Sequence, residues 1–333
     1  MDLTSLSRVV IAHNSVGAED DPSTADVLAQ VELVTAGLDA LGLAHQAVAV
    51  PDWRPWLHVP VEPGTAVFNL MESPPGKPAA LLHAAAALEL MAVPFTGSDA
   101  AVLWITTDKL ATRAILAAEG LPVAPGGRLD PDAPAVLERV PGPWILKPAC
   151  EDASLGLEDD PVCRTAGAAV ERARRLRERF PGQAVVAETF LPGRELNVSL
   201  LARSDAVEAL PVAEIVYEDF PAGMSRVLGY DAKWREDSYA YLHTVRHFPD
   251  EDGLVARVRA LALAAWRIFG LHGYARVDLR LDAAGEPRIL EVNANPCLAA
   301  DAGFMAAAAR AGLGARDVVR RILEDTVGGR EAG

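Results

Sequence analysis

The sequence predicts a mixed α/β protein built from two or three subdomains. Its 333 residues are more than one ordinary domain contains. Strand-like and helix-like segments alternate until about residue 100, which is typical of a small α/β domain with a parallel sheet. From Arg194 onward strands dominate, and we expect an α+β arrangement there. Half of the residues are hydrophobic and 23% are charged, as in folded globular proteins.

The first part of the chain carries the pattern of a compact α/β unit. Its β-rich runs are short and are followed by polar or glycine-containing turns. Ser23 is predicted to cap the first helix, because Asp26 follows three residues later. The predicted elements are strands at residues 8–12, 47–50 and 65–70 and helices at residues 23–42 and 81–91.

The second part begins near Ala100, where the sequence changes character. Asp108 is expected to cap a helix that stops at Gly120. A polar and aromatic insert at residues 217–247 lacks an apolar period, so we predict a mobile functional loop there. The other predicted elements are a Pro/Gly connector at residues 121–127, strands at 144–147, 184–188, 195–202 and 207–217, and helices at 167–180 and 251–269.

Residues 274–298 are predicted to form a β-hairpin that carries unusual polar groups. Apolar and charged residues alternate along its first strand, the period of a half-buried strand. Antiparallel pairing would bring Asp278, Glu291 and Asn293 to one end, and these oxygen ligands suit Mg²⁺. Arg276 would project from the same face as Asp278. A solvated surface hairpin is the alternative interpretation of this segment taken alone.

Two further segments have the residue types of a nucleotide site. Lys147 ends a strand and precedes a loop of small residues at 148–156, whose backbone N–H groups suit phosphates. After another strand, Glu188 and Glu195 flank a turn, as in a linker that contacts an adenine and a ribose. The sequence contains no Walker loop, and an ordinary turn is the alternative in both cases.

Composition excludes several classes of function. A net charge of −15 leaves no basic surplus for a nucleic-acid partner. No apolar run approaches the roughly 18 residues of a membrane span, and the N-terminus lacks a signal-peptide pattern. The three cysteines have no metal-ligand spacing, so we interpret them as reduced thiols of a cytoplasmic protein. Cys297 has no partnering base in sequence, and no covalent nucleophile is predicted.

Six motifs in a fixed order resemble the ATP-grasp superfamily, and most closely its D-alanine–D-alanine ligase branch. The likeness runs from the N-terminal domain to the last helix. The motifs are VPFTGSD, TDKLATRAILAAEGLPV, PWILKPACEDASLGL, VAETFLPGRELNVSLL, YDAKW and YARVDLRLDAAGEPRILEVNANPCL. The resemblance implies an N-terminal Rossmann-like domain (residues 1–104) followed by a two-lobed ATP-grasp fold, with a central lobe (105–190) and a C-terminal lobe (191–330) that carries the metal and catalytic residues.

The resemblance also implies roles for individual residues. The nucleotide contacts would be Lys109 and Lys147 (phosphates), Glu151 and Ser154 (closing loop), Glu188 and Leu191 (adenine linker), Glu195 (ribose) and Lys233 (γ-phosphate). The catalytic residues would be Arg276, Lys233 and Ser154, and the metal ligands would be Asp278, Glu291 and Asn293.

The chemistry that the family performs is an ATP-dependent ligation of a carboxylate to an amine. ATP and Mg²⁺, or Mn²⁺ in its place, are the implied cofactors. Small-molecule substrates such as amino acids or short peptides are the implied partners, without nucleic acid or membrane. A homodimer is a further implication, since members of this branch are commonly dimers through the N-terminal domain.

Three segments depart from the family's substrate-binding pattern. The run GG-x-S-x-E is replaced by AHNSVGAED, in which Ser15 survives and Glu19 or Asp26 would have to supply the acid. H-G-x-x-G-E-D-G is replaced by NLMESPPG (residues 69–76), and residues 295–301 lack the expected hydroxyls. We therefore predict a ligase with altered amino-acid specificity. The alternatives are a true D-alanine–D-alanine ligase, a non-catalytic ATP-binding module, and a ligase with a thiol or hydroxyl acceptor.

Overall fold

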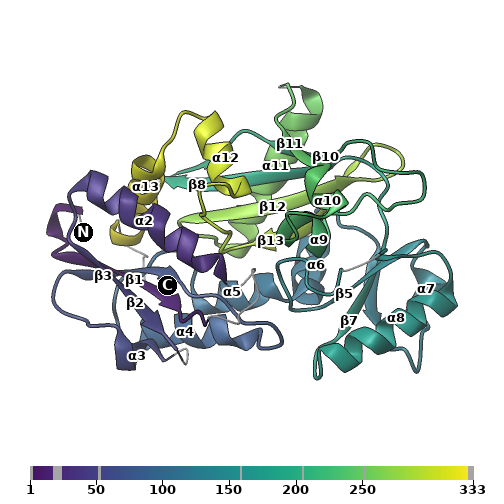
Figure 1. Cartoon of the computed structure of the whole chain (residues 1–333), viewed down its shortest axis with the longest axis horizontal. Coiled ribbons are helices and arrows are strands. Elements are labelled where there is room, and N and C mark those ends of the chain that lie inside the picture. Colours follow the sequence, from purple (N-terminus) through teal and green to yellow (C-terminus); the bar gives the residue numbers. More distant parts are fainter. Residues whose placement is uncertain are drawn as a thin grey trace.

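A computed structural model describes residues 3–17, 25–51, 54–157, 160–204, 206–250 and 252–328. It confirms a mixed α/β architecture with three sheets (Figure 1). The helices are η1 (Leu3–Ser5, 3-10), α2 (Val27–Leu41), α3 (Pro55–His58), α4 (Ala79–Leu90), α5 (Ala100–Thr107), α6 (Lys109–Ala118), α7 (Val136–Arg139), α8 (Ala166–Arg179), α9 (Tyr230–Trp234), α10 (Tyr239–Leu242), α11 (Gly253–Phe269), α12 (Gly303–Arg310) and α13 (Ala315–Val327).

The strands form one parallel and two antiparallel sheets. The parallel sheet has the order β2-β1-β3, with β1 (Arg8–Asn14), β2 (His45–Val50) and β3 (Thr65–Leu70). The second sheet has the order β4-β7-β5-β6, with β4 (Gly126–Leu129), β5 (Trp144–Pro148), β6 (Val162–Cys163) and β7 (Val185–Thr189). The third has the order β11-β10-β8-β12-β13 with β9 beside β8, and contains β8 (Glu195–Arg203), β9 (Ala206–Ala209), β10 (Ala213–Tyr217), β11 (Thr244–His247), β12 (Tyr274–Leu281) and β13 (Pro287–Asn293).

Most predicted elements are found with small shifts at their ends, but the strand predicted at 207–217 is divided into β9 and β10, which both pair with β8. Asp108 caps α6 as expected, since its carboxylate accepts the backbone N–H groups of Leu110 and Ala111. Ser23, the predicted cap of the first helix, lies outside the described residues. The predicted connector at 121–127 contains the start of β4, which pairs with β7. Helix α5 was not predicted, although Asp99 caps it by accepting the N–H of Val102.

The insert at residues 217–247 is more regular than the sequence predicted. It holds α9, α10 and β11, and β11 pairs with β10 along its whole length. A row of edge-to-face and stacked rings joins Tyr217, Phe220, Tyr239 and His243. These rings replace the apolar period that a helix or strand normally shows, which is why the sequence suggested an irregular loop. The mobility of the insert stays a prediction.

The hydrophobic cores do not follow the order of the sequence. One cluster joins α4 and α5 to β8, β12, β13 and α11, and a second joins the parallel sheet and α2 to α12 and α13. The sheet formed by β4–β7 has a separate cluster with α8, and Figure 1 shows it as a lobe at one end of the molecule. The first and last parts of the chain are therefore packed together, while the middle part forms its own unit. The predicted domain boundaries stay a prediction.

Gly37 is expected to be essential where α2 meets α13. A Cβ on Gly37 would lie 2.6 Å from Cγ2 of Val319. Gly37→Ala should therefore lower the free energy of unfolding by about 1–3 kcal/mol, even though alanine favours a helix by about 1 kcal/mol over glycine. Urea denaturation measures the change. Gly167→Ala, on α8, is the control, because a Cβ on Gly167 meets nothing within 4 Å. This substitution should raise the free energy of unfolding by about 0.5–1 kcal/mol. Equal effects of both substitutions would contradict the expectation.

Candidate active site

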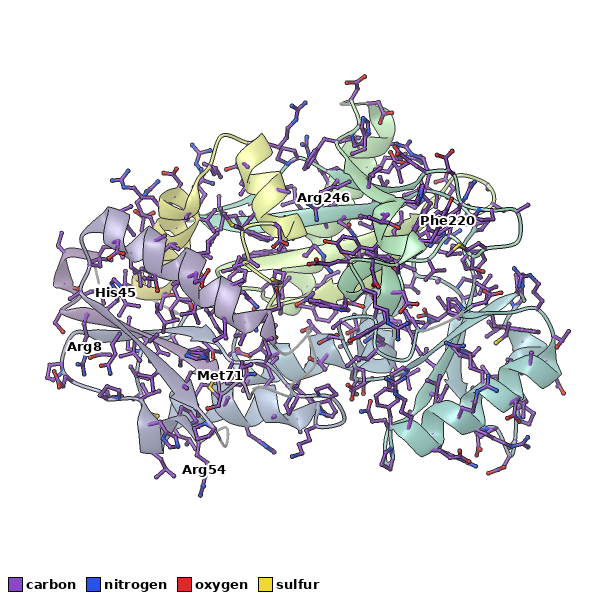
Figure 2. All side chains as sticks on the ribbon, in the orientation of Figure 1. Arg8, His45, Arg54, Met71, Phe220 and Arg246 are labelled. Atoms are coloured by element: carbon purple, nitrogen blue, oxygen red, sulfur yellow. The ribbon has the colours of Figure 1, made fainter. Side chains whose placement is uncertain are left out.

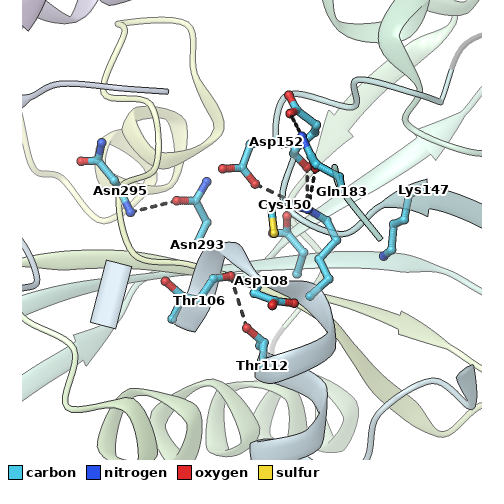
Figure 3. Close-up of polar contacts among 12 residues, drawn as sticks. Thr106, Asp108, Thr112, Lys147, Cys150, Asp152, Gln183, Asn293 and Asn295 are labelled. Carbon is cyan, nitrogen blue, oxygen red and sulfur yellow. Dashed lines mark hydrogen bonds and ion pairs between the residues drawn. The ribbon is translucent and has the colours of Figure 1, made fainter. Parts of the chain in front are cut away.

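A cavity of about 620 Å³ contains every site residue predicted from the sequence. Its walls come from all three sheets and from the loops between them. Figure 3 shows part of it, with Lys147, Asp152 and Asn293 reaching it from separate segments. The predicted residues on its lining are Lys109, Lys147, Glu151, Ser154, Glu188, Leu191, Glu195, Lys233, Arg276, Asp278, Glu291 and Asn293. These residues span 185 positions of the sequence, from 109 to 293, and the fold brings them to one cavity.

The hairpin of β12 and β13 places its polar side chains at one end, as predicted. Asp278 pairs with Glu291 and Arg276 pairs with Asn293. Arg276 donates two hydrogen bonds to Asp278, from Nε at 2.7 Å and from Nη2 at 2.8 Å. Asn197 on the neighbouring β8 donates to the same carboxylate at 2.8 Å. This bonding leaves the carboxylate fixed in position, as a metal ligand requires.

A β-bulge at Leu290 sets the direction of Glu291. The pairing shifts between Asp278, opposite Glu291, and Leu279, opposite Ile289, so that Leu290 is the extra residue. In a regular strand Ile289 and Glu291 would share one face. Here Ile289 is buried in the core whereas Glu291 lines the cavity. The bulge therefore turns the carboxylate of Glu291 toward the cavity while Ile289 stays buried in the core.

Lysine and arginine side chains hold the opposite wall. Lys147 forms an ion pair with buried Glu188 at 2.7 Å, and Arg113 binds the other oxygen of Glu188 at 2.9 Å. Nζ of Lys109 donates to the backbone oxygen of Glu151 at 2.5 Å and lies 3.6 Å from the carboxylate of Asp152. These contacts orient two buried ammonium groups toward the same space, which suits an anionic ligand such as a phosphate chain.

Glu291 lies at the centre of these charges. Burial acts to raise the pKa of Glu291, but the cations Lys109, Lys147, Arg276 and Lys233 outweigh it and hold that pKa below its ordinary value. The pKa of Lys233 is lowered, by burial and by the positive charge of Arg276. Burial opposes protonation of Lys109, yet Glu291 and Asp152 raise its pKa. The site therefore keeps Glu291 ionised in a cavity lined by four cations, where phosphates and a divalent cation would share the charges.

The small-residue loop and the insert are joined across the cavity. Ala153 and Ser154 have positive φ angles of 55° and 63°. The hydroxyl of Ser154 donates to the backbone oxygen of Leu228 at 2.8 Å, and Nε1 of Trp234 donates to that of Ala153 at 3.1 Å. Lys233 lies between these contacts on α9. The loop and the insert thus close over the cavity, with Ser154 holding the insert.

Two predicted nucleotide contacts have partners within the protein. The carboxylate of Glu151 accepts the backbone N–H of Gly76 at 3.1 Å and a hydrogen bond from Gln183. The carboxylate of Glu195 accepts hydrogen bonds from Tyr217 at 2.9 Å and from Arg280 at 3.0 Å. Glu151 therefore ties the 73–77 loop to the middle lobe. Its role and that of Glu195 toward a nucleotide stay predictions.

The segments that depart from the family's pattern meet at the other end of the cavity. Glu72 accepts a hydrogen bond from Gln30 at 2.7 Å, and the thiol of Cys297 donates to Asp26 at 2.8 Å. Asn295 donates its backbone N–H to the side-chain oxygen of Asn293 at 2.8 Å, which links this end to the predicted metal ligands. Asp26 lines the cavity, whereas Glu19, the other acid considered, lies outside the described residues.

Glu72 has the pKa of a group that titrates near neutrality. Burial raises it from 4.5 to about 7; the hydrogen bond from Gln30 opposes this rise, and the charges of Asp26 and Asp152 add to it. Cys297 stays a protonated thiol, because burial and the nearby Asp26 raise its pKa. That protonation agrees with the prediction that Cys297 is not a nucleophile.

Replacing Glu72 by glutamine should stabilise the protein in a pH-dependent way. The folded state keeps the proton of Glu72 to a higher pH than the unfolded chain does, so wild-type stability falls as the pH rises from 4.5 through 7. We expect the advantage of Glu72→Gln in free energy of unfolding to be on the order of 2 kcal/mol larger at pH 8 than at pH 5. Urea denaturation at both values tests this. Exposed Glu62→Gln is the control, and an advantage independent of pH would contradict the expectation.

Sequence reasoning missed several residues that shape the cavity. Arg113, Asn197 and Arg280 hold predicted site residues in place, and Arg246 lines the wall. One signal was present in the composition. The chain has only four lysines, and Lys109, Lys147 and Lys233 all line the cavity. Three of the four lysines therefore mark the cavity, and Lys77 is the exception.

Among the described residues, no group of three His, Cys, Asp or Glu side chains is arranged to hold a metal ion. The predicted set of two carboxylates and one amide is of a different kind and would need further ligands, such as water or phosphate oxygens. In the same part of the chain, no helix is long and apolar enough to cross a membrane.

Comparisons with known proteins show what this chain resembles in sequence and fold. Residues 129–324 match the family model described as D-ala D-ala ligase C-terminus. The D-alanine–D-alanine ligase of Cupriavidus necator is 33% identical over 71% of this chain and 68% of its own length. That of Chromohalobacter salexigens is 32% identical over 96% and 95%. The structure of a D-alanine–D-alanine ligase from Bacillus anthracis complexed with ATP has the same fold, with a TM-score of 0.74, 18% identity and coverage of 96% and 97%.

Proposed function

Because this chain belongs to the D-alanine–D-alanine ligase family of ATP-grasp enzymes, ATP-dependent and ADP-forming ligases that make C–N bonds, we propose that it joins two amino acids through an acyl phosphate. The observation that carries the proposal is the arrangement around Glu291. Lys109, Lys147, Arg276 and Lys233 line the same cavity as Glu291 and hold its pKa below the ordinary value, and Asp278 pairs with Glu291 across the hairpin. Such a site can neutralise a triphosphate and hold a divalent cation at the same time.

The residues present fit both implied cofactors. Lys109 and Lys147 would bind the phosphates of ATP, and Lys233 would reach the terminal phosphate from α9. Asp278, Glu291 and Asn293 would hold Mg²⁺, whose preference for oxygen ligands they satisfy. The cation would offset negative charge on the phosphate oxygens.

The proposed reaction has two steps. A carboxylate oxygen of the first substrate attacks the γ-phosphorus, the bond to the bridging oxygen breaks, and ADP leaves. The amine of the second substrate then attacks the acyl carbon, expels phosphate and loses a proton as the amide forms. Arg276, held by Asp278 at 2.7 Å, would stabilise the oxygens that gain charge in both steps. The closed insert excludes water, which would hydrolyse the acyl phosphate.

D-alanine is the first candidate substrate, since it is the substrate in the names of the relatives. Altered specificity, predicted from the sequence, is the second candidate. The observation that favours it is the cavity end formed by Asp26, Glu72 and Cys297, in the segments that depart from the family's pattern. A site that is built to hydrogen-bond one substrate discriminates strongly against others, so these side chains bear directly on specificity.

Release of ADP from Mg-ATP, measured against a matrix of D- and L-amino acids and dipeptides, tests the function. Mass spectrometry of the product identifies the bond formed. Formation of D-alanyl-D-alanine as the main product would establish D-alanine as the substrate and exclude altered specificity. Absence of ADP release with every substrate, despite ATP binding, would contradict the proposed reaction and favour a non-catalytic ATP-binding module.

A further inference from the structure

Arg280 is a buried cation of the cavity wall to which the proposed reaction assigns no role. It lies on β12 opposite Glu195 of β8, lines the cavity and is only 5% exposed. Its Nε is buried without a hydrogen-bond partner among the described residues. Burying a charge and leaving one of its donors unpaired costs free energy of folding. Packing alone therefore does not account for an arginine at this place.

Three separate segments meet at this guanidinium. Nη1 of Arg280 donates to Oε2 of Glu195 at 3.0 Å, and Nη2 donates to the backbone oxygen of Arg226 in the insert at residues 217–247. The ring of Phe190, in the predicted adenine linker, has its centroid 5.0 Å from Cζ of the same side chain. Arg280 therefore contacts the predicted ribose acid, the predicted adenine linker and the insert at once.

The carboxylate of Glu195 is held by the protein through one oxygen only. Tyr217 donates to the same Oε2 at 2.9 Å, and no described residue donates to Oε1. Burial and the charge of Glu195 raise the pKa of Tyr217, so the phenol keeps the proton that it donates. The ring of Tyr217 packs edge-to-face against Phe220, labelled in Figure 2, at a centroid distance of 5.1 Å. Because Glu195 lines the cavity, Oε1 is available to a ligand hydroxyl.

The contact with Arg226 holds a stretch of the insert that borders the cavity. Val227 and Leu228, the next two residues, line the cavity. Ser154 of the small-residue loop donates to the backbone oxygen of Leu228 at 2.8 Å, so this stretch is held by the sheet on one side and by the loop on the other. Lys233 follows on α9, and its position depends on where this stretch lies.

We propose that Arg280 is a positioning residue that couples the contact of Glu195 with the nucleotide ribose to closure of the insert. A ribose hydroxyl that donates to Oε1 fixes the carboxylate, the carboxylate fixes the guanidinium, and the guanidinium holds the backbone of Arg226. Glu195 is the one ion-pair partner of Arg280 among the described residues, so a displaced carboxylate would leave a buried charge unpaired. The contacts therefore form together. This inference rests on the proposed function, in which the nucleotide is ATP.

The kinetic test compares ATP with 2′,3′-dideoxy-ATP, which lacks both ribose hydroxyls. Phosphate release with the best amino-acid substrate gives KM for each nucleotide. In the wild type KM should be about tenfold lower for ATP than for the dideoxy nucleotide, the effect of a hydrogen bond to a charged group. Arg280→Met keeps the length of the side chain and removes its charge, and the preference for ATP should fall below about threefold. A merely structural role would raise both constants equally and leave the preference intact.

Two further variants sharpen the comparison. Arg288→Met is the matched control, because Arg288 pairs with Arg280 across the hairpin but lies outside the cavity lining. It should keep the wild-type preference. Arg280→Lys should keep part of the preference, since it leaves a charge near Glu195 without the second donor for Arg226.

Trypsin digestion measures closure of the insert without turnover. In the wild type, saturating Mg-ATP without amino acids should slow cleavage after Arg226 about tenfold, because the closed stretch has to open before it is cut. Saturating 2′,3′-dideoxy-ATP should protect this bond less. In Arg280→Met the two nucleotides should protect it equally. Mass spectrometry of the fragments identifies the bond that is cleaved.

Each outcome decides the inference. Loss of the preference for ATP in Arg280→Met, with the preference retained in Arg288→Met, supports it. An unchanged preference in Arg280→Met, or no preference in the wild type, would overturn it while the ligase activity stands. If Arg280→Met does not fold, Arg280→Lys carries the same comparison. Absence of phosphate release from the wild type with every amino acid would overturn the proposed function, and the digestion would still decide whether Arg280 couples the ribose to the insert.

Discussion

Replacing Glu291 by glutamine is expected to lower kcat/KM by about a thousandfold, which corresponds to about 4 kcal/mol of lost transition-state stabilisation. The substitution keeps the size of the side chain and removes its charge. Glu291 is the acid around which Lys109, Lys147, Arg276 and Lys233 are arranged, so its charge balances theirs when a divalent cation is bound. The Mg²⁺ concentration required for half-maximal ADP release should rise in parallel. Steady-state kinetics across Mg²⁺ concentrations measures both effects.

Glu286 provides the control for Glu291 because it lies on the same hairpin, outside the cavity. Its side chain is 53% exposed and forms an ion pair with Arg257 at 2.8 Å. Glu286→Gln should leave both kcat/KM and the requirement for Mg²⁺ unchanged. A Glu291→Gln enzyme with wild-type dependence on Mg²⁺ would show that Glu291 does not hold the metal, even if its activity were low.

Substituting Lys147 by alanine should raise KM for ATP and lower kcat, with a combined loss in kcat/KM of about a hundredfold to a thousandfold. Lys147 is buried and aimed into the cavity by its ion pair with Glu188 at 2.7 Å. The loss would leave Glu188, only 2% exposed, with Arg113 as its remaining cation. A decrease in stability should therefore accompany the loss of activity, since a buried charge is left partly unpaired.

Nucleotide binding separates the two effects of Lys147→Ala. Calorimetry with ADP should show weaker binding at a temperature at which circular dichroism shows a folded protein. The control is Lys77→Ala, since Lys77 is exposed and is the one lysine outside the cavity lining. Wild-type affinity for ADP in folded Lys147→Ala would remove Lys147 from the nucleotide site, and a similar loss in Lys77→Ala would indicate a general effect of charge.

Much of the fold and of the proposed nucleotide end of the cavity could be predicted from the sequence, because helices, strands and motifs leave local signals. Alternating residues define β12, and the order of the six motifs indicates the family. Asp108 caps α6 through two backbone N–H groups close to it in sequence. Every predicted site residue lines the cavity, and the resemblance to the family supplied the full set, because each residue belongs to one of the six motifs.

The proposed substrate end of the cavity could not be predicted in this way. Glu72, Asp26 and Cys297 come from three distant segments, and only packing of the first part of the chain against the last brings them together. Arg246 lies in an insert whose order depends on contacts between aromatic rings rather than on an apolar period. Its place beside Gly303 depends on how β11 and α12 pack, which no local pattern encodes.

The hairpin of β12 and β13 shows most clearly which features the sequence determined and which the tertiary structure decided. The sequence by itself determined the residue types, the antiparallel pairing and the predicted oxygen ligands Asp278, Glu291 and Asn293. The tertiary structure decided which way they face. A strand's period of two would place Ile289 and Glu291 on the same side. The bulge at Leu290 separates them, because burial of Ile289 in the core and placement of Glu291 among four cations are both satisfied only when one extra residue is inserted between them.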